Sequence, residues 1–149
     1  MPTNVFVPQS EVQAQNAYGE VYLSNGDDGD FNDGADYVMN IGEIGELDPN
    51  GLVIQDGSNA WLKIGPGGDG LYEVHFSVSA HSAFSPDFKI RLNVNSAQDC
   101  KIAARGGQAA AASSGLSRFA EGDVVALEIR TSDYMSIGNL HLWIRRIDL

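Results

Sequence analysis

Apolar and polar residues alternate along the second half of the chain. In the clearest run, residues 71–80, apolar side chains take every second position: Tyr72, Val74, Phe76 and Val78 alternate with Glu73, His75, Ser77 and Ser79. Side chains two residues apart lie on the same face of a β-strand, so this run predicts a strand with one buried and one polar face. Residues 88–94, 125–130 and 140–145 repeat the pattern and predict three more such strands.

The first half of the chain predicts shorter strands separated by turn residues. Its strand-like segments are Ala17–Leu23, Tyr37–Ile41, Leu52–Gln55 and Ala60–Ile64, and Lys101–Arg105 is a further short one in the second half. The pairs Asn50-Gly51 and Asp56-Gly57 supply the residues of positive φ that tight hairpins need. The glycine-rich run 65–70 ends one strand before the next begins.

The segment Gln108–Ser113 leaves two alternatives open. Its four consecutive alanines favour a helix by propensity. The run is too short for a stable helix and has no amphipathic stripe, whereas small residues also let a strand lie close to its neighbour. We favour the strand because strands surround the segment. With it the chain has about eight to ten short strands, which predicts an all-β, antiparallel sandwich or barrel.

The length of the chain fits one domain preceded by an arm. A chain of 149 residues and 16.0 kDa can build a single core without disulfides. Residues 1–16 show no periodicity, and their apolar side chains Val5, Phe6 and Val7 stand between two prolines. We therefore expect an extended N-terminal arm over residues 1–16 and a folded domain over residues 17–149.

The charge of the chain is unevenly distributed. Residues 1–70 hold 12 acidic residues and one basic residue, whereas residues 71–149 hold eight of each, so the net charge of −11 comes from the first half. Binding to nucleic acid or to an anionic membrane needs clustered Lys and Arg. We therefore expect neither partner.

Residues 25–36 concentrate the acidic charge, with five aspartates in twelve residues. The spacing is not that of an EF-hand, because Asp33 takes the place of its glycine and Met39 that of its final glutamate. Two interpretations remain: a solvated or partner-facing acidic loop, which we favour, and a Ca²⁺ site of another kind. The ligands of such a site would be Asp27, Asp28, Asp30, Asp33 and Asp36.

No motif in the sequence indicates catalysis. The glycine-rich run lacks the Lys of a phosphate-binding loop, and Ser113 and Ser114 lie outside a G-x-S-x-G motif. Cys100 follows Asp99, whose charge disfavours a thiolate. A metal-dependent jelly-roll enzyme would need an H-x-H pair, but His75 and His81 are six residues apart. We expect a protein that is not an enzyme and has no cofactor other than the Ca²⁺ considered above.

Three segments of the second half resemble the globular domain of the C1q/TNF superfamily. They are G-L-Y-E-V-H-F-S-V-S at 70–79, L-N-V-N at 92–95 and L-S-R-F-A-E-G-D-V-V-A-L at 116–127. The resemblance covers residues 70–149, and residues 17–64 agree with it only in their number of strands. It implies a jelly-roll sandwich that assembles as a homotrimer.

The resemblance also implies which residues lie between subunits. In this superfamily the first, central and terminal strands turn their outer faces toward the threefold axis. The outward residues that we expect at this interface are Tyr18, Tyr22, His75, His141 and Trp143. The alternatives are aromatic residues scattered over the surface and, for Glu73 and His75, an acid–base pair or metal ligands on one strand face.

The chain differs from secreted members of the superfamily because it lacks a collagen stalk, a coiled-coil stem and the N-terminal pattern of a signal peptide. An acidic, stalkless jelly roll with an arm resembles bacteriophage virion proteins, chiefly trimeric capsid decoration (cement) proteins. This resemblance implies synthesis in the host cytoplasm, a place on the virion surface, and a major capsid protein or another virion protein as partner. The arm, through Val5, Phe6 and Val7, and the base of the trimer would then stabilise the shell.

Two further interpretations stay open at this point. The domain could be a receptor- or glycan-binding fibre tip, although the 16 residues before it contain no heptads for a trimeric stem. It could also be a cellular C1q-like adhesion module.

Overall fold

The computed structural model describes residues 16–23, 36–82, 87–93, 98–105, 110–130 and 135–148. Within these ranges the chain forms strands and no helix. The eleven strands are β1 (Tyr18–Leu23), β2 (Asp36–Val38), β3 (Glu43–Leu47), β4 (Val53–Gln55), β5 (Leu62–Ile64), β6 (Gly70–Ser82), β7 (Asp87–Leu92), β8 (Gln98–Arg105), β9 (Ala110–Phe119), β10 (Val124–Arg130) and β11 (Met135–Arg146).

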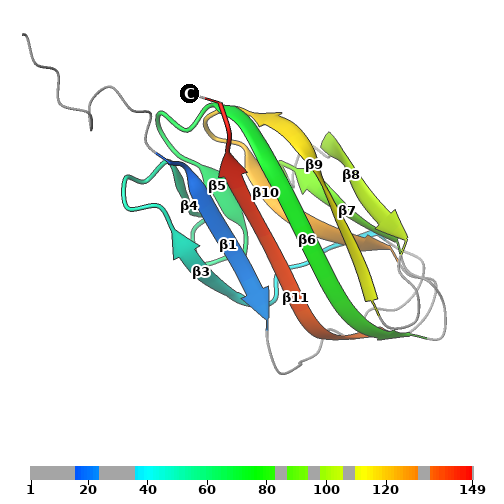
Figure 1. The fold of residues 1–149 in the computed structure, drawn as a ribbon. Helices are drawn as coiled ribbons and strands as arrows, with labels where there is room; N and C mark the ends of the chain where they lie inside the picture. The colour runs from blue at the N-terminus through cyan, green and yellow to red at the C-terminus, as the bar shows by residue number, and fades with distance from the viewer. Residues whose placement is uncertain are drawn as a thin grey trace, which may run out of the picture.

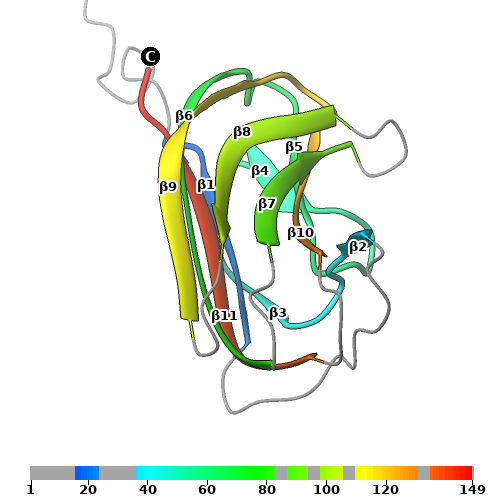
Figure 2. The ribbon, with the colours of Figure 1, turned by 90° about the vertical axis from the view of Figure 1, so that its right-hand side faces the viewer.

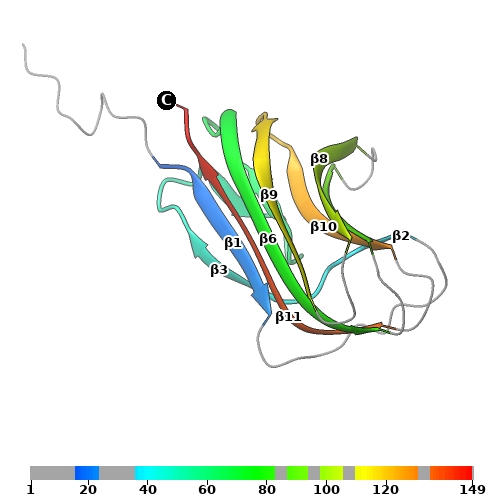
Figure 3. The same cartoon turned by 45° about the vertical axis from the view of Figure 1, so that its right-hand side comes forward.

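The strands form two antiparallel sheets that pack face to face. The first sheet has the order β3-β1-β11-β6-β9, and the second has the order β4-β5-β10-β7-β8, with β2 paired to β10. Figure 1 looks onto the first sheet, and Figure 2 shows the two layers from the side. The turned view in Figure 3 shows how β6, β9 and β11 bend along their length. The predicted all-β antiparallel sandwich is confirmed.

The core lies between the two sheets and follows the alternation of the sequence. The apolar members of the alternating runs point inward and are buried, including Tyr72, Val74 and Phe76 of β6. The Tyr72 ring packs on Phe119 with 5.2 Å between the ring centroids, and its hydroxyl donates to the carbonyl of Gly68. Burial raises the pKa of Tyr72 to about 12, so this hydroxyl keeps its proton at physiological pH.

The structure corrects the prediction for β3 and β2 and decides between the alternatives left open for β9. β3 was not predicted, because Glu43–Leu47 offers only two apolar residues around a glycine. The alanine-rich segment forms the first part of β9, so over its described residues the strand alternative was right and the helix was wrong. The segment predicted over Tyr37–Ile41 is a strand only as far as Val38.

The aspartate at position 48 holds the turn between β3 and β4. Asp48 is buried, and its carboxylate accepts hydrogen bonds from the backbone N–H groups of Asn50, Leu52 and Val53. A buried carboxylate is tolerated where several donors satisfy it. This residue therefore stabilises the turn that carries the chain from the first sheet to the second.

The two ends of the described fold lie together. The N–H of Arg146 donates to the carbonyl of Ala17 over 2.8 Å, beside the pair formed by Tyr18 and Arg145 in the β1–β11 register. After β11 the carboxylate of Asp148 accepts the N–H of Leu71 over 2.6 Å. Both ends are thereby fastened to the same end of the first sheet.

The predicted arm over residues 1–16, with Val5, Phe6 and Val7, lies outside the described residues except for Asn16. The division of the chain into an arm and a domain that begins at residue 17 therefore stays a prediction.

Candidate functional site

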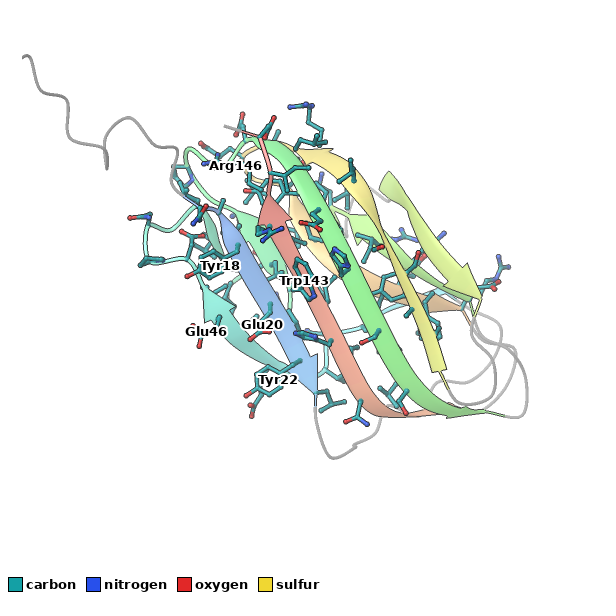
Figure 4. The ribbon with its side chains drawn as sticks, viewed as in Figure 1. Tyr18, Glu20, Tyr22, Glu46, Trp143 and Arg146 are labelled. Carbon is teal, nitrogen blue, oxygen red and sulfur yellow. The ribbon has the colours of Figure 1, made fainter. Side chains whose placement is uncertain are left out.

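The outer face of the first sheet carries polar and aromatic side chains in ordered rows. Antiparallel pairing places outward residues of β1, β11, β6 and β9 side by side. In strand order β1, β11, β6, β9, the three rows are Tyr18–Arg145–Glu73–Leu116, Glu20–Trp143–His75–Ser114 and Tyr22–His141–Ser77–Ala112. We call this surface the row face. Figure 4 shows Tyr18, Glu20, Tyr22 and Trp143 on it.

All five residues that we predicted at a subunit interface lie on the row face. Tyr18 and Tyr22 come from β1, His75 from β6, and His141 and Trp143 from β11. The fold thus brings together residues that are more than 120 positions apart in the sequence. Their role between subunits stays a prediction.

An imidazole stacked on an indole lies near the centre of the row face. The rings of His75 and Trp143 are nearly parallel, with 4.0 Å between centroids and an angle of 10° between planes. Nε2 of His75 lies 3.1 Å from Oε1 of Glu73, and the other carboxylate oxygen of Glu73 accepts from Arg145 over 2.7 Å. These hydrogen bonds, that from Arg145 first, lower the pKa of Glu73 below its usual value.

A second histidine–glutamate pair joins β11 to β1. Nε2 of His141 lies 2.7 Å from Oε2 of Glu20, whose other oxygen accepts the N–H of Glu46 in β3 over 3.0 Å. The backbone N–H of Glu46 and then His141 lower the pKa of Glu20. In the next row position the hydroxyl of Tyr22 donates to Glu43 over 2.8 Å, which raises the pKa of that phenol. These contacts therefore favour the ionised form of Glu20.

Small side chains leave a hollow beside the stacked rings. One depression of about 440 Å³ is lined by His75, Trp143 and the small residues of β6 and β9. A second, of about 510 Å³, shares Ser77, Ala112 and His141 with the first, so the two adjoin. On the other side of the hollow the sheet ends in β9, where Leu116 is 57% exposed. The second depression is also bordered by Tyr22 of β1, and a further one of about 360 Å³ by Tyr18, so the row face is hollowed between its larger side chains from β1 to β9.

The predicted Ca²⁺ ligands fall outside what the structure describes. Asp27, Asp28, Asp30 and Asp33 precede β2, and the side chain of Asp36 at its start is likewise not described. Among the described side chains, no three His, Cys, Asp or Glu come close enough to hold a metal ion. Nor do the described ranges contain a helix long and apolar enough to cross a membrane.

Sequence reasoning missed two acidic residues at the edge of the first sheet, the partner of His141 in β1 and the partner of Tyr22 in β3. Glu20 contacts His141, which is 121 residues away, and no local pattern encodes such a pair. Glu43 lies in β3, a strand that the sequence did not predict. The pair of Glu73 and His75 was accessible to prediction, because positions i and i+2 share one face of a strand.

Comparison with solved structures identifies the fold. Murine APRIL at pH 8.0 matches with a TM-score of 0.67 and 11% sequence identity, over 89% of this chain and 100% of that chain. The PRD1 vertex protein P5 matches with a TM-score of 0.66 and 13% identity, over 91% of this chain and 100% of that chain. The globular domain of the zebrafish complement 1qA protein matches with a TM-score of 0.57 and 8% identity, over 85% and 94% of the two chains.

The chain has the C1q/TNF-like jelly-roll fold. No protein-family model matches its sequence, and no curated protein matches it in sequence either. At such low identity the likeness concerns the fold alone. The resemblance noted over residues 70–149 is confirmed at that level.

Proposed function

We propose that this chain is a non-enzymatic structural protein of a virion surface that works as a homotrimer and decorates the shell. The trimer is supported by the likeness of its fold to TNF and C1q domains. The place on a virion is supported by the likeness to the PRD1 vertex protein P5. The observation that carries the proposal is the row face, whose stacked rings and paired charges cover the outer side of β1, β11 and β6.

The geometry of the rows supports a contact in which the β1 side of one copy meets the β9 side of the next. In a ring of three, each copy presents one side of its row face to the other side of the next copy. Rotation about an axis parallel to the strands leaves the height of each residue unchanged, so each row meets the same row of the next copy. The row that holds Tyr22, Ser77 and Ala112 then brings the tyrosine of one copy against Ser77 and Ala112, which line the first depression, in the next copy.

The first test is the solution mass of the full chain by light scattering coupled to gel filtration. We expect three times the chain mass of 16.0 kDa. A mass of 16.0 kDa at all protein concentrations would contradict the trimer.

The hollow gives the second test. Ala112→Trp fills it from β9, and we expect the dissociation constant of the trimer to rise by at least about thirtyfold, as for an interface hot spot. Ala120→Trp is the matched control, because Ala120 is exposed in the turn after β9 and lies off the row face. Equal masses for the two variants would contradict the docking of Tyr22 in the hollow.

The virion role is tested on particles. Antibody against the purified chain should label virus particles grown from the genome that encodes it. Deletion of residues 2–16 should abolish binding of the added protein to undecorated shells. The truncated chain should still have the mass of a trimer. Label confined to vertices would replace shell decoration with a vertex position. Full occupancy by the truncated protein would contradict the role proposed for Val5, Phe6 and Val7.

A further inference from the structure

Two histidines lie near the middle of the row face, and each contacts a glutamate. His141 faces Glu20 from β1 and Ser77 from β6. His75 faces Glu73 on its own strand, Trp143 from β11 and Ser114 from β9. The side chains of both histidines are partly open to solvent, with 33% of His75 and 44% of His141 exposed. Both imidazoles can therefore exchange protons with water until something covers the face.

The remaining charges around the two histidines are mostly negative. Arg145 from β11 is bound to Glu73, and Glu43 from β3 is reached through the hydroxyl of Tyr22. On β9 the nearest charged side chain is Arg118, which pairs with Asp148 beyond the rows. With neutral histidines the hydrogen-bonded groups of the row face comprise three carboxylates and one guanidinium. Glu46 of β3, which lines a depression together with His141, adds a fourth carboxylate. Protonation of both histidines would offset most of this negative excess in every copy.

We propose that protons bound by His75 and His141 control the assembly of the chain, so that the trimer tightens as the pH falls from 8.5 to 6. This inference rests on the homotrimer of the proposed function. It gives the row face a second property, which is sensitivity to the acidity of the surroundings.

The physical reason is the loss of water when three copies close on one another. A carboxylate removed from water needs a cation or several donors, and an imidazolium supplies both charge and N–H. A cation over the face of an indole gains further attraction, and the stacked geometry of His75 and Trp143 provides that contact. Histidine is the side chain whose charge changes near neutral pH, so the range from pH 8.5 to 6 is the one to examine.

Sedimentation velocity of the full chain at pH 8.5, 7 and 6, at one ionic strength, tests the inference. We expect the dissociation constant of the trimer to fall at least about tenfold from pH 8.5 to 6, because assembly then takes up protons. A dissociation constant that is the same at all three pH values would overturn this inference but not the proposed trimer. A mass of one chain at every pH would overturn the trimer and this inference together.

Variants locate the protons that are bound. His75→Gln/His141→Gln keeps a neutral donor at both positions, and we expect its assembly to be independent of pH in this range. His81→Gln is the control, because it changes the third histidine of the chain and should keep the dependence. A dependence that survives in the double variant would overturn the assignment.

A second variant protects the test against misfolding of the first. Glu20→Gln/Glu73→Gln removes two carboxylates and leaves both histidines in place. We expect it to assemble at pH 8.5 as tightly as the unmodified chain does at pH 6. Weak assembly of this variant at pH 8.5, with an unchanged circular dichroism spectrum, would overturn the electrostatic explanation.

Discussion

The outer faces of the two sheets differ in how deeply their ion pairs are buried. On the second sheet Glu128 of β10 is only 1% exposed and pairs with Lys89 over 3.1 Å and with Arg91, both from the neighbouring strand β7. On the first sheet the carboxylates of Glu20 and Glu73 remain 28% exposed, and each is paired with a histidine. One face has its charges enclosed within the subunit, and the other keeps them in reach of water.

This difference separates stability from assembly. A buried ion pair makes its contribution in the folded subunit whether or not another molecule is present, and losing one partner is costly. A half-exposed ion pair adds little to the free energy of unfolding. Its interaction energy changes when another protein surface covers it and removes water. The enclosed ion pairs of the second sheet thus contribute to the stability of the subunit, whereas the half-exposed pairs of the first sheet are suited to the contact between copies that is proposed above.

The largest effect is expected from removing the enclosed carboxylate. Glu128→Ala takes away the ion pair of Arg91, whose side chain is only 13% exposed, so the free energy of unfolding should fall by about 3 kcal/mol. Glu20→Ala on the first sheet is the matched control and should cost about 1 kcal/mol or less. Urea unfolding at low protein concentration measures both. Equal losses of unfolding free energy in the two variants would contradict the proposed difference between the buried and the half-exposed ion pairs.

A smaller effect is expected where β3 meets β1. A methyl group on Gly45 would overlap the side chain of Glu20, so Gly45→Ala must displace the carboxylate that binds Glu46 and His141. We expect a loss of about 1 kcal/mol, because one hydrogen bond to a charged group is broken. We also expect a changed NMR titration of His141.

Gly138→Ala is the control for this variant. At that glycine in β11 an added methyl group would meet only ordinary contacts, so we expect less than about 0.5 kcal/mol. If Gly45→Ala left the titration of His141 unchanged, the link between β3 and this pair would be wrong.

The smallest effect is expected from acid acting on the first sheet. The pKa values of Glu20 and Glu73 are lowered in the folded chain, so their contribution is present above the usual value of 4.5 and is lost as the pH falls through the lowered values. The urea midpoint should therefore begin to fall below about pH 4.5. Glu20→Gln/Glu73→Gln should flatten this decline, and an equally steep decline in that variant would show that other carboxylates cause it.

The sequence predicted the fold wherever a strand has one apolar and one polar face. β6, β7, β10 and β11 alternate over much of their length, and their inward residues form a large part of the core. β3 escaped prediction because its glycine makes room for the side chain of Glu20, a contact that belongs to tertiary structure. β9 was ambiguous because the small residues that hollow the row face carry little strand signal of their own.

The outward histidines and aromatic residues of the candidate site were predictable, and so was the Glu73–His75 pair within one strand, but the contacts between strands were not. Alternation alone placed His75, His141 and Trp143 on outward positions. The stack of His75 on Trp143 depends on the register between β6 and β11, which is fixed by the whole sheet. The partner of His141 depends on the pairing of β1 with β11 and on a strand that the sequence did not reveal.

The bond between Ala17 and Arg146 has a practical consequence for anyone who attaches cargo to this domain. Both ends of the described fold leave from one pole of the sandwich, so a fluorescent protein or peptide epitope joined at either end would be displayed from that pole. In a closed ring of three, all such passengers would crowd on one side. The opposite pole would stay bare and available for attachment to a support.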